Sequence, residues 1–330
     1  NFLHLGLFVF IYYLAVQIML GWKSPIPLVK ALLMNGAVVT MVVAVELGIA
    51  YYGLGVISDS NWPSLWDYLQ WLSSHQHFLT WGVNALAALM SVQIALALAQ
   101  SRRTTSRWTH TNLLVLAIAG GVVLLTTFSR GGLVGLVAAL ATLTILPSAR
   151  ERMAWWREAP AASRIRALAW MGAGTLVIGS AFAVLSILRP RTVVIRLNLW
   201  EAALSMLAER PLFGGGPGTF GYLLYQASTG YVETGMPFFN SAHNVYLNLA
   251  AEGGVLTLAV GIWITVAALV AGWRGWRLQD RASRWTTAGA LAGWVGLMVA
   301  GLFDVPWAFP FATLYLALLT AIMVFPLCQE

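Results

Sequence analysis

The segment SAHNVYLNLAAEGG contains the residues best suited to acid–base chemistry. His243 and Asn244 stand directly before a long apolar stretch, and Glu252 follows about two helical turns later. A histidine can remove a proton from a hydroxyl group near neutral pH, which lysine and arginine cannot readily do. Two interpretations follow from these residues alone: His243 is a general base, or it is a polar residue near the start of a helix.

A group of arginines is the second feature with chemical potential. The guanidinium group keeps its charge at any working pH, and its planar fork matches the oxygens of a phosphate. Four of these arginines lie in the stretch 189–244 that leads to His243, and the fifth lies in TTFSRGGLVGL. We therefore expect a bound anion near them. The arginines are Arg130, Arg189, Arg191, Arg196 and Arg210.

Acidic residues are few, and three lie within or at the ends of apolar stretches: Glu46, Glu252 and Asp304. A carboxylate in such a place needs a partner or water, and a nearby arginine would serve. The sequence contains no HExxH, no Asp-x-Asp and no cluster of histidines and carboxylates with metal-ligand spacing. The single cysteine, Cys328, excludes a disulfide framework and a thiolate-rich metal site. We expect no metal ion and no other cofactor.

The composition is that of an integral membrane protein. Of 330 residues, 59% are hydrophobic and only 9% are charged, whereas a soluble domain carries roughly 25% charged residues. A membrane-spanning helix needs about 20 largely apolar residues. By this criterion we predict an all-α, polytopic transmembrane bundle that forms a single domain over residues 1–330. Its nine predicted spans are 3–20, 28–52, 78–100, 112–128, 133–146, 167–188, 245–273, 288–303 and 309–326.

Lysines and arginines indicate the orientation, because short loops rich in them stay in the cytoplasm. Fourteen of the nineteen lie in or beside four alternate loops, which we therefore place in the cytoplasm. The net charge of +7 thus reflects topology, and we expect no nucleic-acid partner. Residue 1 falls on the outer side, which predicts an odd number of helices upstream if the complete protein starts in the cytoplasm. The outer segments are 53–77, 129–132, 189–244 and 304–310.

The large outer loop, 189–244, reads in three parts. Apolar residues recur at helical spacing over 192–210, which predicts a helix along the outer membrane surface with Arg196 and Trp200 on one face. The glycine-rich LFGGGPGTFG that follows favours a helix stop and turn over a phosphate-binding loop, because the lysine and hydroxyl residue of a P-loop are absent. The last part is polar and aromatic, which favours interfacial anchoring over stacking on sugar rings.

Four motifs in this order resemble the O-antigen ligase and O-antigen polymerase family, also called Wzy-C: TFSRGGLVGL, RLNLWEAALSMLAERPLFGGGPGTFG, HNVYLNLAAEGGVLTL and GLFDVPW. The resemblance covers about residues 112–325. It implies a membrane enzyme of the GT-C type with about twelve spans, so about three precede this chain. The implied donor is a glycan on undecaprenyl pyrophosphate, and the implied acceptor is a lipid or another glycan.

The resemblance also implies roles for individual residues. Outer arginines that hold the pyrophosphate would be Arg130 in SRGG and Arg196 in the RxxxW segment, with Arg191 as the alternative to Arg196. The histidine that acts on the acceptor hydroxyl would be His243 in HNxYL. We expect support for this site from Asn244, Glu252, Trp200 and Asp304.

The chemistry expected from these residues is direct, inverting glycosyl transfer without a metal ion, at the outer face of a bacterial cytoplasmic membrane. The enzyme must neutralise the charge that develops on the diphosphate and deprotonate the incoming hydroxyl, for which arginines and one histidine suffice. A ligase is the first interpretation, and a polysaccharide polymerase of the same family would share the donor chemistry. A transporter of anions such as inorganic carbon is the third, although a carrier usually shows repeats and binding residues near the middle of the membrane.

Overall fold

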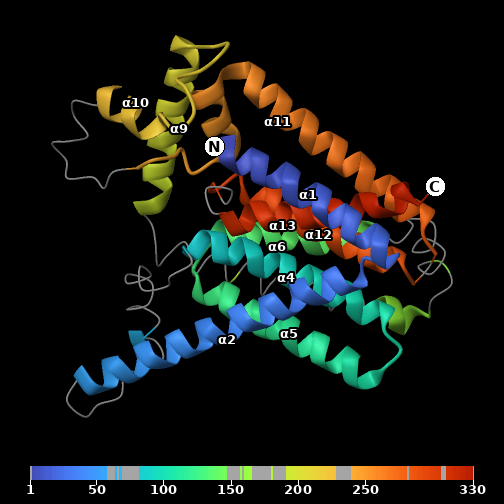
Figure 1. Cartoon of the computed structure of the whole chain (residues 1–330). Helices are drawn as coiled ribbons and strands as arrows, with labels where there is room; N and C mark the ends of the chain where they lie inside the picture. The colour runs from blue at the N-terminus through green and yellow to red at the C-terminus, as the bar shows by residue number, and fades with distance from the viewer. Residues whose placement is uncertain are drawn as a thin grey trace.

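The computed structural model describes residues 2–57, 64, 67–68, 82–146, 157, 160–165, 180, 191–227, 239–280, 282–305 and 310–329. Within these residues every regular element is helical (Figure 1). The helices are α1 (Phe2–Trp22), α2 (Ile26–Ile57), α4 (Val83–Arg103), α5 (Arg107–Thr126), α6 (Arg130–Ile145), α9 (Arg191–Glu209), α10 (Phe220–Ala227), α11 (Val245–Leu278), α12 (Arg284–Ala300), α13 (Pro310–Val324) and the 3₁₀ helix η3 (Phe325–Cys328).

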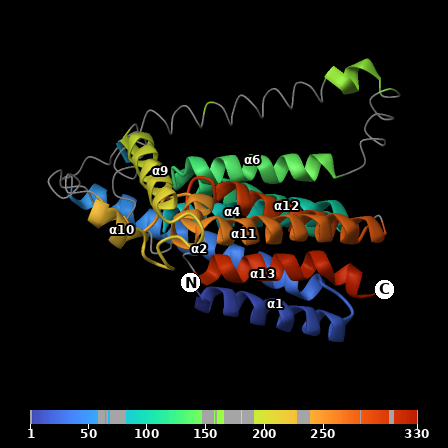
Figure 2. The same ribbon diagram turned by 90° about the horizontal axis from the view of Figure 1, so that it is seen from above.

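The long apolar helices run side by side, and α9 lies across one end of them with α10 next to it (Figures 1 and 2). The start of α6, the start of α11 and the end of α12 meet at this same end, which we call the α9 end. Segments that the charge pattern placed on one side of the membrane are therefore neighbours in space. The helix predicted over 192–210 is confirmed as α9.

Apolar helices form at eight of the predicted spans, and the predicted span at 167–188 lies outside the described residues. Among the described helices, five are long and apolar enough to cross a membrane, and α1 and α6 contain shorter apolar segments. Many of their large apolar side chains are exposed, for example Trp263 of α11 at 70% and Met34 of α2 at 70%. Such surfaces are stable against lipid tails, so the protein is a polytopic helical membrane protein.

Helix α4 is the centre of the bundle, with buried side chains along almost its whole length. Small residues let α6 and α12 pack closely against α4 and against each other. A Cβ atom at Gly135 would lie 2.6 Å from the carbonyl oxygen of Gly296, and one at Gly132 would overlap the Cβ atom of Ala87. This close packing fixes the start of α6, where Arg130 lies, relative to the end of α12.

Helix α11 differs from the continuous span predicted over 245–273, because it is broken near its start. Gly254 has φ 68° and ψ −173°, a conformation that is not helical and that side-chain-bearing residues rarely adopt. The glycine-rich loop 211–216 packs at this break, where the N–H of Gly215 donates to the carbonyl of Ala251 at 2.9 Å. The break therefore attaches the loop, and the helices on either side of it, to α11.

Candidate active site

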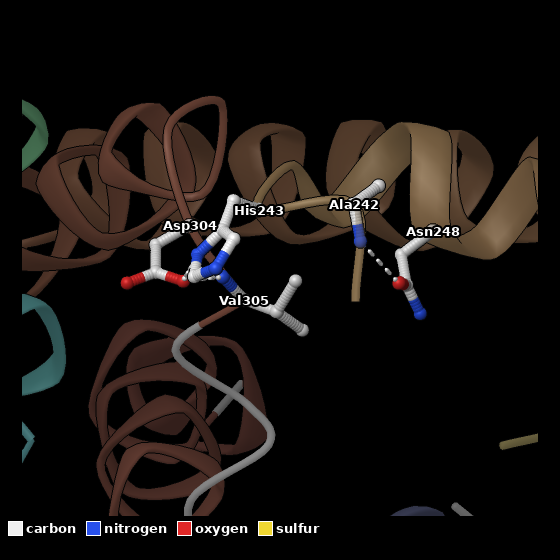
Figure 3. A network of polar contacts seen from close by, with 5 residues as sticks. All are labelled: Ala242, His243, Asn248, Asp304 and Val305. Atoms are coloured by element: carbon white, nitrogen blue, oxygen red, sulfur yellow. Dashed lines mark hydrogen bonds and ion pairs between the residues drawn. The ribbon is translucent and has the colours of Figure 1, made fainter. Parts of the chain in front are cut away.

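His243 and Asp304 form the polar centre of the α9 end (Figure 3). The Nδ1 atom of His243 lies 2.9 Å from Oδ1 of Asp304, and the same oxygen accepts a hydrogen bond of 2.8 Å from the N–H of Val305. The two side chains come from different helix ends, which are joined by the N–H of Val245 donating to the carbonyl of Gly301 at 2.8 Å. With Nδ1–H donated to the carboxylate, the Nε2 atom of His243 is the free proton acceptor.

The backbone at His243 is in the left-handed region, with φ 47°. On one side, the N–H of Ala242 donates to Oδ1 of Asn248 at 3.0 Å (Figure 3). On the other side, Asn244 caps α11, and its Oδ1 accepts from the N–H groups of the second and third helical residues at 3.0 and 3.1 Å. Asn244 is thus a helix cap beside the site. The sequence interpretation missed Asn248, although it lies one turn after Asn244.

Arg130 is the first residue of α6 and is positioned by a tight turn. Phe128 has a left-handed φ of 52°, and Ser129 caps the helix by accepting from the N–H of Gly132 at 3.1 Å. A Cβ atom at Gly131 would lie 2.7 Å from Cβ of Phe303. The turn that carries Arg130 therefore packs against the residue that directly precedes Asp304.

Arg196 completes the cluster from α9. Burial lowers the pKa of Arg196, the negative charge of Asp304 opposes this shift, and the positive charge of Arg130 adds to it. Burial alone would raise the pKa of Asp304, but the hydrogen bond and charge of His243, the Val305 N–H and the charge of Arg196 hold it below its ordinary value. The structure therefore links the four residues in sequence: Arg130 acts on Arg196, Arg196 on Asp304, and Asp304 on His243.

Trp200 lies one turn after Arg196, so the two side chains share a face of α9. Its indole Nε1 atom is buried and has no hydrogen-bond partner among the described residues. A buried donor without an acceptor costs about 1–3 kcal/mol, which makes this group a candidate to meet an oxygen of a ligand. Arg191 begins α9, and its side chain lies outside the described part of the chain.

Glu252 is buried, and two of its contacts join α11 to neighbouring segments. Its backbone carbonyl accepts from the N–H of Gly216 at 2.8 Å, and its Oε1 accepts from the N–H of Phe220, the first residue of α10, at 3.4 Å. Glu252 therefore holds the glycine-rich loop and α10 on α11. Because the amides of Gly214, Gly215 and Gly216 donate to protein carbonyls, the loop acts as a turn, as the sequence predicted.

Within the described residues, no three histidine, cysteine, aspartate or glutamate side chains come together in a way that could hold a metal ion. The positive charge of the site comes from arginines, and its proton acceptor is the imidazole of His243. This combination suits an anionic leaving group and an incoming hydroxyl, the two partners of a transfer reaction.

Comparison with known protein families identifies the matching part of the chain. Residues 113–262 match the family model described as O-antigen ligase, and the match includes Arg130, Arg196 and His243. A search of curated proteins finds no match. The family is enzymatic and contains ligases and polymerases. Residues 113–262 of this membrane protein therefore resemble the O-antigen ligase family, as the first three sequence motifs predicted, and the fourth motif, GLFDVPW, lies beyond the match.

Proposed function

We propose that the protein is a glycosyltransferase that moves a glycan from undecaprenyl pyrophosphate to an acceptor hydroxyl. The α9 end would face the outside of a bacterial cytoplasmic membrane, as the distribution of lysines and arginines indicates. The observation that carries the proposal is the His243–Asp304 pair, 2.9 Å apart, with Arg196 coupled electrostatically to its carboxylate. One site thus combines a proton acceptor with guanidinium charge.

The donor diphosphate would bind between Arg130 and Arg196. Burial, the largest cause, and the charge of Arg130 lower the pKa of Arg196, and the charge of Asp304 opposes these two effects only in part. A bound diphosphate would reverse the balance, because each guanidinium would then face negative oxygens. An oxygen of the donor would also give the buried indole N–H of Trp200 an acceptor.

The acceptor hydroxyl would lie at Nε2 of His243. As the hydroxyl oxygen forms a bond to the anomeric carbon, its proton passes to Nε2. The bond from that carbon to the diphosphate breaks with its electron pair, so the diphosphate leaves with an added negative charge that the arginines stabilise. Asp304 holds the imidazole by Nδ1 and stabilises the imidazolium that forms. Attack opposite the leaving group inverts the anomeric centre.

A transfer assay tests this proposal with the full-length protein in nanodiscs, an undecaprenyl pyrophosphate-linked glycan, and either a lipid or a second carrier-linked glycan as acceptor. We expect His243→Ala and Arg196→Ala to lose transfer. The matched controls keep it: His110→Ala, whose Nδ1 contacts the carbonyl of Ser101 at 2.9 Å, and Arg210→Ala, which is exposed just after α9.

Each outcome of the assay has a defined meaning. Transfer that survives in the folded His243→Ala variant refutes the assignment of the base. Transfer to the lipid acceptor supports a ligase, and transfer to the second glycan supports a polymerase. Excess chelator should leave the rate unchanged, because the guanidinium groups take the place of a divalent ion; a strict requirement for added magnesium or manganese contradicts the metal-independent mechanism.

A further inference from the structure

The side chain of Asn248 contacts the backbone of Ala242, the residue directly before His243 (Figure 3). Its Oδ1 accepts the N–H of Ala242 at 3.0 Å, and its own N–H donates to the carbonyl of Asn244 at 2.9 Å. We propose that Asn248 is a positioning residue for glycosyl transfer, which keeps the turn at His243 in the conformation that aims the imidazole. The inference rests on the proposed role of His243 as the base.

The turn needs such support because of its backbone conformation. At φ 47°, His243 occupies a region that side-chain-bearing residues seldom adopt, and a backbone of this kind costs about 1–3 kcal/mol. It persists only where the surrounding contacts over-determine it. A relaxed turn would rotate the Cα–Cβ bond of His243 and move the imidazole away from Asp304.

Contacts fix the chain on both sides of the strained residue. Behind it, Ala242 is fully buried and its N–H is held by Asn248. Ahead of it, Asn244 caps α11, and the N–H of Val245 is held by the carbonyl of Gly301. The contacts ahead of His243 hold the start of α11, because Asn244 caps this helix and the Val245 contact joins it to the end of α12. The side chain of Asn248 therefore restrains Ala242, the residue directly before His243.

The experiment compares three variants of the full-length protein. Asn248→Leu has nearly the same shape but no acceptor, and Asn248→Asp keeps an oxygen at the accepting position. The matched control is Asn35→Leu, which also removes a side-chain acceptor, since Oδ1 of Asn35 accepts from Tyr315 at 2.7 Å in the bundle. The measurements are kcat and KM for transfer, and the ¹⁵N chemical shift of His243 in a background where the other four histidines are glutamine.

We expect Asn248→Leu to lower kcat about 100-fold with little change in the KM of the donor, since misplacing a catalytic group by about 1 Å can have such an effect. Asn248→Asp should restore most of the rate, and Asn35→Leu should keep it. The ¹⁵N shift should show loss of the contact with Asp304 in Asn248→Leu alone. An unchanged shift in Asn248→Leu, or an equal loss in Asn35→Leu, overturns the positioning role. Because the shift needs no turnover, a parent protein that shows the contact but no transfer refutes the proposed function separately.

Discussion

Asp304→Asn is the most informative single change, because it removes one charge and keeps the shape of the side chain. The new amide would still present an oxygen toward Nδ1 of His243, but the bond would no longer be charge-assisted. Such bonds contribute about 1.5–3 kcal/mol when a charged group takes part. The Asp304 side chain is 18% exposed, so the smaller value of surface ion pairs, about 0.2–1 kcal/mol, does not apply.

The effect on the rate follows from these magnitudes. The charge of Asp304 matters most when His243 becomes a cation, which happens as the acceptor proton is transferred, so the loss falls on the transition state. Since each 1.4 kcal/mol corresponds to about a factor of ten, kcat should fall about 10- to 150-fold. The KM of the donor should change much less, because the arginines that bind the diphosphate remain.

The assay is steady-state transfer in nanodiscs at saturating acceptor, with donor concentration varied and folding checked by thermal unfolding. Asp280→Asn serves as the control, because Asp280 also accepts a backbone N–H, at 2.6 Å from Ser283, but lies between α11 and α12 at the other end of the bundle. A folded Asp304→Asn protein with the parental kcat would refute the reasoning. So would a variant whose defect lies entirely in the KM of the donor.

Three further results are expected. Gly254→Ala should destabilise the protein by at least about 1–3 kcal/mol, because Gly254 has a φ of 68° and the new Cβ atom would contact the carbonyl of Leu212. The control in thermal unfolding is Gly48→Ala, whose Cβ atom would have no described atom within 4 Å. Equal unfolding midpoints for the two variants contradict the prediction. Trp200→Phe removes the indole N–H and should lower kcat/KM for the glycan donor about tenfold. The control is Trp294→Phe in α12, which removes another buried N–H that has no described partner and should keep the parental kcat/KM. A parental kcat/KM in Trp200→Phe excludes the contact between Trp200 and the glycan donor. Because the pKa of Asp304 is depressed in the folded state, its contribution to stability is present above the ordinary carboxyl pKa of about 3.9 and is lost as the pH falls through the lower folded value. Arg196→Ala removes a charge that lowers the pKa of Asp304, so this carboxyl group should take up its proton at a higher pH. An infrared titration of the carboxyl band measures this, and superimposable titrations of parent and variant would rule it out.

Much of the architecture follows from the sequence because a membrane imposes simple requirements. An apolar stretch of about 20 residues has to be a helix, since the bilayer offers no other partners to its backbone groups. The helices at 26–57, 83–103 and 107–126 therefore appear where hydropathy predicted them. The arginines of the site could also be found in this way, because Arg130 and Arg196 gain nothing for topology in the segments where they occur.

Other features depend on contacts between segments that are far apart in the chain. Glu252 contacts the glycine-rich loop and the start of α10, and its pairing with an outer arginine stays a prediction. Its role became visible only with the break of α11 at Gly254, since a regular helix would have used the same carbonyl for its own hydrogen bonds. A glycine pair inside an apolar stretch is equally typical of close helix packing, so hydropathy alone does not predict a break.

The sequence by itself determined the class of protein, most of the helices, the resemblance of residues 113–262 to the O-antigen ligase family, and the candidates Arg130, Arg196 and His243 for the site. Tertiary structure alone decided that His243 meets Asp304, which lies 61 residues away, and that Asn248 accepts the N–H of Ala242, the residue directly before His243. The physical reason is that hydropathy specifies each helix from its own residues. Which helix ends meet depends on how closely α6, α12 and α4 pack, and that depends on steric contacts such as Gly135 against Gly296.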